Sequence, residues 1–335
     1  MKQQELLKTE KAITLVKEIF SRELSKHLDL VKVSSPLVIL DGTGINDDLN
    51  GIERPVTFPI KALNEQKGVV VHSLAKWKRL RLKELGIESG KGILTDMRAL
   101  RPDEEYSPLH SIYVDQWDWE KHIEVKDRNL AYLKSTVTRI YQALKETEIE
   151  VQIQFPELIA VLPNSIEFIH AEELLKLYPL LTPKQRETEI VKKYGAVFII
   201  GIGGKLSDGT IHDGRAADYD DWSTQNESGF YGLNGDIILW HPLLECAFEV
   251  SSMGIRVDKI ALLKQLKQKG CEKKAKLQFH SILLSGELPE SIGGGIGQSR
   301  VCMFMLKKLH IGEVQVGIWP NEEKQKMQLM GVSLL

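Results

Sequence analysis

The chain contains 335 residues, of which 42% are hydrophobic and 27% charged, and its formal net charge is −2. This length is enough for one large domain or two smaller ones, and the near-neutral charge provides no overall field that would attract nucleic acid. The three cysteines are odd in number and far apart, so they match neither a disulfide framework nor a C-x-x-C metal site and favour a reducing cytosol. There is no signal-peptide core, and no apolar run approaches the roughly eighteen residues of a membrane helix. We therefore expect a cytoplasmic protein without a membrane span.

The N-terminal half is expected to start and end with helices. Apolar residues at helical spacing predict an amphipathic helix over 8–29, and spacings of 3, 4, 3 and 4 predict a long helix over 130–144. Between these helices, short apolar or alternating segments predict strands at 56–60, 69–71 and 112–117.

The C-terminal half is expected to combine helices with a sheet. A capping box of Thr182 and Gln185 predicts a helix that ends at Gly195, and Asp258 is the expected cap of a helix that ends near Gly270. The expected strands are 196–200, 236–240, 247–250 and 314–318. Most strands lack the regular crossover helix of a doubly wound fold. We therefore predict an α+β fold with an antiparallel β-sheet flanked by helices.

The glycine-rich segment Gly293–Arg300 is the most unusual feature of the sequence. It is not a dinucleotide fingerprint, because Gln298 stands where the third glycine would be needed, and no Gly-Lys-Ser/Thr follows as in a P-loop. We expect a tight backbone that approaches a ligand closely and ends in Arg300 at the start of a helix, where a planar guanidinium can stack on adenine. A glycine-lined contact between helix and sheet is the alternative.

A second unusual region is the hairpin formed by residues 97–105 and 108–120. Arg101 leaves the first strand, and a planar arginine in such a place can hold a phosphate or carboxylate through two parallel hydrogen bonds. The alternative is a surface hairpin in which Arg101 pairs with Asp103 or Glu104.

Two acidic residues occur on strands that are close in sequence. If these strands pair antiparallel, the carboxylates of Asp236 and Glu249 can face each other and bind Mg²⁺ together with phosphate oxygens. The alternative is that these charges only protect an edge strand.

Other candidate segments are better explained by structure than by function. The basic run 76–83 suggests a solvated helix face rather than an RNA site. Residues 201–205 resemble a nucleotide loop, but Leu206 stands where a P-loop needs Ser or Thr, so we expect a turn at the end of the sheet. His72 and His110 lie near the motifs and are expected in core or supporting positions.

The order of a strand arginine, acidic residues on later strands and a glycine-rich segment before an arginine helix resembles class II aminoacyl-tRNA synthetase cores, most closely the aspartyl and asparaginyl type. Six segments are similar, in the same order, to the ammonia-dependent asparagine synthetases (aspartate–ammonia ligases), and the resemblance covers about residues 11–335. These segments are 72–79, 100–104, 113–120, 201–209, 218–223 and 291–300.

This resemblance implies a single class II synthetase-like catalytic domain over residues 1–335 that forms a homodimer. It implies an ATP-dependent ligase that converts L-aspartate and ammonia into L-asparagine, with AMP and pyrophosphate released and Mg²⁺ required. In that scheme, the β-carboxylate attacks the α-phosphorus to form β-aspartyl-adenylate, and ammonia then displaces AMP.

The resemblance also implies roles for residues. Asp47, Arg101 and Gln116 are expected to be catalytic, with Arg101 at the α-phosphate and Asp47 on a loop that closes over the intermediate and accepts a proton from ammonium. Asp48 is an alternative to Asp47, because the loop over 41–46 aligns loosely. ATP and Mg²⁺ are expected at Asp236 and Glu249, with Arg300 also at ATP. Aspartate is expected to contact Ser73, Lys78, Asp118, Asp220 and Ser251.

Three other functions were weighed against this one. An aspartyl-tRNA synthetase core would need an anticodon-binding domain, for which the matched region leaves no room, so no nucleic-acid partner is expected. A non-catalytic synthetase paralogue acting as a binding module should have lost Arg101, Asp236, Glu249 or Arg300, and all four are present. A glutamine-dependent enzyme would need an N-terminal nucleophilic cysteine, whereas the first cysteine here is Cys246.

Overall fold

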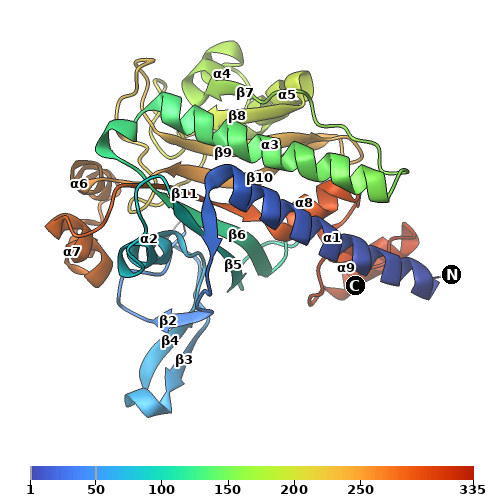
Figure 1. Ribbon diagram of the computed structural model, residues 1–335, viewed down its shortest axis with the longest axis horizontal. Coiled ribbons are helices and arrows are strands. Elements are labelled where there is room, and N and C mark those ends of the chain that lie inside the picture. The colour runs from blue at the N-terminus through green and yellow to red at the C-terminus, as the bar shows by residue number, and fades with distance from the viewer. Residues whose placement is uncertain (1, 50) are drawn as a thin grey trace.

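The structure is a computed structural model that describes residues 2–49 and 51–335, and an eight-stranded sheet forms its centre (Figure 1). The strand order is β1-β5-β6-β11-β10-β9-β8-β7. Only the two outermost pairs, β1–β5 and β7–β8, are parallel. The strands are Leu30–Lys32 (β1), Gly92–Leu100 (β5), Tyr113–His122 (β6), Glu167–His170 (β7), Ala196–Ile200 (β8), Asn234–His241 (β9), Cys246–Ile255 (β10) and Ser291–Gly297 (β11). The predicted α+β class with a mainly antiparallel sheet is confirmed.

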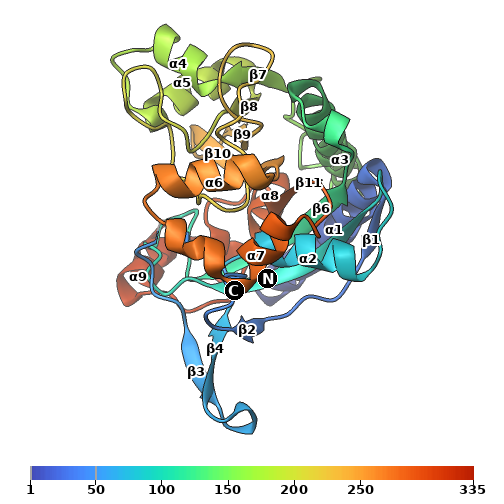
Figure 2. The same ribbon diagram turned by 90° about the vertical axis from the view of Figure 1, so that its left-hand side faces the viewer.

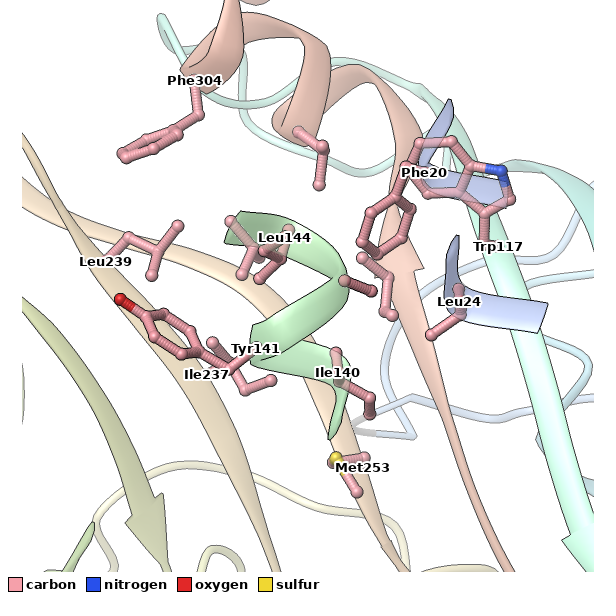
Figure 3. Close-up of a cluster of buried hydrophobic side chains, with 14 of the residues drawn as sticks. Phe20, Leu24, Trp117, Ile140, Tyr141, Leu144, Ile237, Leu239, Met253 and Phe304 are labelled. Carbon is pink, nitrogen blue, oxygen red and sulfur yellow. The ribbon is translucent and has the colours of Figure 1, made fainter. Parts of the chain in front are cut away.

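Two long helices, α1 (Lys2–Leu28) and α3 (Leu130–Gln154), lie side by side across one face of this sheet (Figure 1). Their apolar sides form the main core together with the sheet (Figure 3). The rings of Phe20 and Trp117 lie 4.6 Å apart between centroids. Because side chains alternate along a strand, Trp117 and Trp119 of β6 enter this core, while Gln116 and Asp118 project from the opposite face.

The opposite face of the sheet carries shorter helices, with α2 packed on β5, β6 and β11 and α5 on β8, β9 and β10 (Figure 2). Helix α8 instead packs against α1 in the main core, and the other helices lie around this face and the ends of the sheet. A small antiparallel sheet in the order β2-β4-β3 projects away from the body. These elements are Ala75–Glu84 (α2), Ala171–Leu177 (α4), Pro183–Tyr194 (α5), Lys259–Gln268 (α6), Gln278–Ser285 (α7), Gln298–Met305 (α8), Asn321–Leu329 (α9), Val38–Leu40 (β2), Thr57–Ile60 (β3) and Gln66–Val70 (β4).

Local signals in the sequence located several helix ends correctly. The hydroxyl of Thr182 accepts the backbone N–H of Gln185, as the capping box predicted, and Gly195 ends α5 with a φ of 78°. Asp258 caps α6 through the N–H of Ala261. No helix among the described residues is long and apolar enough to cross a membrane.

The strand predicted at 314–318 is absent from the described structure. This segment follows a 3-10 turn and runs as irregular chain. Val316 and Ile318 are mostly exposed, while the side chain of Gln315 is buried and hydrogen-bonds Ser111 and Ser299. The alternating apolar pattern did not produce a strand because the polar Gln315 points inward, where Ser111 and Ser299 hold it, and the segment runs as irregular chain around this contact.

Candidate active site

A deep cleft lies over the sheet face opposite α1 and α3, with a cavity volume of about 310 Å³. Strands β6, β9, β10 and β11 form its floor, and loops after β4, β5 and β8 form its walls. Every site residue predicted from the sequence lines this one cleft: Asp47, Ser73, Lys78, Arg101, Gln116, Asp118, Asp220, Asp236, Glu249, Ser251 and Arg300.

The tight backbone expected over the glycine-rich segment is the regular strand β11, which runs directly into helix α8. Strand β11 is central in the sheet and contains four glycines. Gly293 lies opposite Glu120 and Gly295 opposite Asp118. A Cβ at Gly293 would overlap the Glu120 carboxylate, and one at Gly295 would overlap the amide oxygen of Gln116. The glycines are therefore needed because their bare backbone leaves space for polar side chains of β6 in the cleft.

A fully buried ion cluster closes the base of the cleft. Arg256 at the end of β10 donates to Glu120, with Nη2 2.8 Å from Oε2, and also donates to Asp220. Ser291 donates its hydroxyl to Glu120 at 2.7 Å. Burial opposes the charge on Arg256, but Glu120 and Asp220 outweigh it and raise the pKa of Arg256. Arg256 therefore fixes the position of Asp220, which is predicted from the sequence to contact aspartate.

Helix α2 contradicts the expected solvated basic face. Lys76, Lys78 and Arg79 are all buried. Lys76 Nζ lies 2.8 Å from Asp218 Oδ2, and Arg79 donates to two backbone carbonyls. The helix packs on the sheet with a charged inner side, and each charge is matched by a group distant in sequence. The prediction that the basic residues of α2 face solvent was therefore wrong, because polarity alone does not show which groups they pair with.

Lys78 is the residue of helix α2 that places a positive charge in the cleft. Its ammonium group donates to Asp118 and, at 2.8 Å, to the carbonyl of Gly294. Burial lowers the pKa of Lys78, although the Asp118 charge opposes this shift. Lys78 and Asp118 thus form a buried pair on the cleft floor, in which Asp118 Oδ2 has no hydrogen-bond partner within residues 2–49 and 51–335.

Arg215 lines the cleft and was missed by the sequence analysis. Its guanidinium pairs with Asp236, lies 3.0 Å from the Ser252 hydroxyl and is 3.4 Å from Asp220. Burial opposes the charge, but Asp236 and Asp220 together raise the pKa of Arg215. The residue stands in the irregular connection between β8 and β9, where no periodic pattern marks it.

Asp236 and Glu249 lie on the same side of neighbouring strands but are not direct cross-strand partners. Asp236 is opposite Ser252, and Glu249 is opposite Ile238, with an irregularity in β10 between Glu249 and Ser251. Such a bulge redirects side chains. Burial raises the pKa of Asp236 to about 6, with Arg215 opposing the shift and Glu249 adding to it. Two carboxylates that repel each other in this way fit a divalent cation, which would favour their charged forms.

Arg101 lines the cleft from the position directly after β5. Arg101 does not form the alternative ion pair with Asp103, because Asp103 pairs with Arg54, whose hydrogen bonds lower the pKa of Asp103 to about 2. Arg101 instead donates to the His72 carbonyl at 3.2 Å, and its Nε is buried without a protein partner in the described part of the chain.

Arg300 lies in the first turn of α8, as predicted. It donates to the Glu249 carbonyl at 2.9 Å and to His110 Nε2 at 2.8 Å. Burial, followed by the charge of Arg300, lowers the pKa of His110 to about 4. His110 is therefore neutral at physiological pH and can accept this hydrogen bond, so it holds the guanidinium in position.

The predicted loop residue Asp47 is buried in the wall of the cleft. Its carboxylate accepts the Leu49 N–H and the Ser73 hydroxyl, each at 2.9 Å. Asp48, the alternative, is half-exposed and paired with Lys274 outside this cleft. The geometry therefore favours Asp47 over Asp48 as the carboxylate that faces the cleft.

Four cleft residues have buried polar atoms without a hydrogen-bond partner among the residues described: Arg101 Nε, Asp118 Oδ2, Arg215 Nε and Ser251 Oγ. Of these, Arg215 Nε lies near an opposite charge, 3.4 Å from Asp220 Oδ2. Buried polar groups are almost always hydrogen-bonded in folded proteins. Their gathering around one cavity indicates that a polar ligand completes the site.

Comparisons with known proteins point to one family. The model of the aspartate–ammonia ligase family matches residues 7–331. The chain is 56% identical to the aspartate–ammonia ligase of Parabacteroides distasonis over 98% of this chain and 96% of that protein. It is 52% identical to that of Clostridium perfringens over the same shares. The asparaginyl-tRNA synthetase of Pyrococcus horikoshii, solved with asparaginyl-adenylate, has the same fold, with a TM-score of 0.69 and 13% identity over 93% of this chain and 70% of that one.

Proposed function

Because the chain belongs to the aspartate–ammonia ligase family, we propose that its central cleft makes L-asparagine from L-aspartate, ATP and ammonia through β-aspartyl-adenylate. The observation that carries this proposal is the set of buried polar atoms on Arg101, Asp118 and Ser251, all lining one cleft, that lack a hydrogen-bond partner in the part of the chain that the structure describes. An aspartyl-adenylate carries phosphate, amine and carboxylate groups that could supply all three partners.

In the first half-reaction, a β-carboxylate oxygen of aspartate attacks the α-phosphorus of ATP and pyrophosphate leaves. Arg101, which keeps an unpartnered buried Nε, stabilises the charge that develops on the α-phosphate oxygens. Arg300, fixed by His110 and the Glu249 carbonyl, holds the adenine and phosphate end of the nucleotide.

Asp236 and Glu249 are the residues that fit Mg²⁺. Both line the cleft, and the raised pKa of Asp236 reflects its burial and the repulsion from Glu249. A bound cation would offset this repulsion. Bound there, Mg²⁺ would neutralise charge on the phosphate oxygens. Arg215 keeps Asp236 oriented through their ion pair.

Aspartate fits the polar floor of the cleft, next to Asp236 and Glu249. Lys78 attracts its α-carboxylate, and the unpartnered Oδ2 of Asp118 accepts from its ammonium group. Asp220 completes the anionic side of this pocket, while Ser73, Gln116 and Ser251 supply neutral hydrogen-bonding groups. The glycines of β11 leave room for the Glu120 and Gln116 side chains beside the strand, and Gln116 forms part of this floor.

In the second half-reaction, the nitrogen lone pair of ammonia attacks the β-carbonyl carbon. The bond between this carbon and the phosphate oxygen breaks, and AMP leaves with the electron pair. Asp47, a buried carboxylate held in position at the cleft wall by two donors, accepts the proton that ammonium loses to become ammonia. The attacking nitrogen then loses its second proton to the phosphate of the departing AMP. The burial of Asp47 also helps to exclude water from the reactive acyl-adenylate.

We propose further that the protein acts in the cytoplasm as a homodimer, as a single catalytic domain and without nucleic acid. The test is AMP and asparagine formation from aspartate, ATP and ammonium, with and without added tRNA. Asparagine formation independent of tRNA supports the proposal. Failure to form asparagine, or aminoacylation of tRNA, would contradict it.

A further inference from the structure

A second cavity, of about 430 Å³, lies on the other side of the Asp47 segment. Asp47, Leu49, Arg215 and Ala216 line both this cavity and the catalytic cleft. Asp47 is therefore in the wall that the two cavities share. Asp48, Glu53, His72, Cys271 and Lys274 line the second cavity and not the cleft.

His72 is the most deeply buried of the residues that line this second cavity, with 1% of its surface exposed. Its backbone N–H donates to Asn46 Oδ1, its carbonyl accepts from Arg101, and its ring Nδ1 lies 3.1 Å from the backbone oxygen of Asp47. His72 thus touches the segments of both expected catalytic residues, Asp47 and Arg101.

The tautomer of His72 follows from these contacts. A carbonyl oxygen can only accept, so Nδ1 must carry the hydrogen, and in the neutral ring Nε2 is then an acceptor with a free lone pair. This Nε2 is buried and has no hydrogen-bond partner within residues 2–49 and 51–335. The wall of the second cavity therefore contains a buried acceptor that lacks a donor.

The cations around this cavity are already engaged. Lys274 pairs with Asp48, Arg215 pairs with Asp236, and Lys269 lies 5.7 Å from the ring centre of Trp222. The cavity also contains carboxylates, including that of Asp47 in the shared wall. A small species with several N–H donors and a positive charge matches this set of acceptors.

We propose that the second cavity is the ammonium-binding site of the enzyme, and that ammonium donates to His72 Nε2 before it passes Asp47 into the cleft. This inference rests on the proposed reaction, to which it adds a site separate from those of aspartate and ATP. His72 acts as a binding residue for the nitrogen substrate, and the Asp47 carboxylate is the next acceptor along the path.

Two substitutions separate the two ring nitrogens of His72. His72→Asn keeps an amide N–H near the position of Nδ1 and removes the acceptor at Nε2, whereas His72→Gln places an amide oxygen near Nε2. Loss of a hydrogen bond to a charged ligand weakens binding about tenfold or more. We expect His72→Asn to raise the KM for ammonium by about that factor. The KM for aspartate and ATP, and aspartate-dependent exchange of pyrophosphate into ATP, should stay near wild type. His72→Gln should have the smaller effect on the ammonium KM.

The matched control is His122→Asn. The ring Nδ1 of His122 also contacts a backbone carbonyl, that of Ile87 at 2.7 Å, but His122 lines neither cavity. This variant should leave the ammonium KM unchanged. Asp48→Asn removes a carboxylate from the second cavity alone, so it should raise the ammonium KM even if the His72 variants fold poorly.

Several results would overturn the proposal. An unchanged ammonium KM in His72→Asn, or equal losses in ammonium use and pyrophosphate exchange, would assign His72 a structural role only. An unchanged ammonium KM in Asp48→Asn would also count against the site. Hydroxylamine, which is uncharged near neutral pH, should be less affected than ammonium by His72→Asn, and equal effects would contradict a cation site. Absence of asparagine formation by the wild-type protein would instead refute the underlying reaction.

Discussion

Replacement of Arg101 by lysine should reduce activity far more than the retained positive charge suggests. In the structure, the guanidinium uses Nη2 to hold the His72 carbonyl at 3.2 Å, and Nε remains buried without a protein partner. A lysine has one nitrogen and cannot make both contacts with the planar geometry of arginine. Loss of one transition-state contact of this kind costs about 2.7–4 kcal/mol, or roughly 10²–10³ in rate.

The same structure predicts a small effect of Arg101→Lys on folding. Among the described residues, the Arg101 side chain makes one hydrogen bond, to the His72 carbonyl, and a typical bond of this type contributes about 0.5–1.5 kcal/mol. The assay is aspartate-dependent exchange of pyrophosphate into ATP, measured with thermal unfolding of the same sample. Near-normal exchange would show that Arg101 is not at the α-phosphate. A large loss of stability would show that the kinetic loss is indirect.

Four further predictions follow from the cleft. Asp236→Ala and Glu249→Ala should each weaken Mg²⁺-ATP use strongly, and the double variant should add little if they hold one ion; additive losses would contradict a shared metal. Because the pKa of Asp236 is raised to about 6, its carboxylate protonates as the pH falls through 6, so the KM for Mg²⁺-ATP should rise there, and a flat profile would contradict this. Asp47→Asn should slow asparagine formation while pyrophosphate exchange persists; loss of exchange would assign Asp47 to aspartate binding. Gly295→Ala should raise the KM for aspartate because its methyl group displaces the Gln116 amide from the cleft floor, and normal kinetics would show that the position of Gln116 does not matter for aspartate use.

Local sequence signals predicted those elements whose ends depend on neighbouring residues. Thr182 and Gln185 form the capping box that their spacing indicated. The alternation around Trp117 and Trp119 produced a strand with one apolar face. In contrast, the segment 314–318 did not form a strand, because Gln315 is held by Ser111 and Ser299, and the sequence does not show such contacts between distant residues.

The candidate site could be predicted as a set of residues but not as a set of contacts. The family resemblance located residues such as Arg101 and Asp47, which do line one cleft. Lys76 was misassigned because its partner, Asp218, is 142 positions away in sequence. Arg215 was missed because its importance depends on ion pairs with strand and loop residues that only the tertiary fold brings together.

The glycines of β11 illustrate the same limit. A cluster of glycines in a sequence favours a turn, yet Gly293 and Gly295 are extended residues in the centre of the sheet. Their role became visible only with the register, which places them opposite Glu120 and Asp118. The requirement for glycine arises from the side chains of the neighbouring strand, and no local pattern contains that information.

The central claim is that the cleft activates the β-carboxylate of aspartate as an adenylate. The most direct measurement uses aspartate whose β-carboxylate oxygens are isotopically labelled, followed by mass analysis of the nucleotide and phosphate products. Attack of this carboxylate on the α-phosphorus leaves one labelled oxygen on AMP when ammonia cleaves the carbon–oxygen bond. We therefore predict one labelled oxygen in each AMP formed with asparagine, and none in pyrophosphate. Unlabelled AMP, or label in pyrophosphate or inorganic phosphate, would contradict the adenylate route.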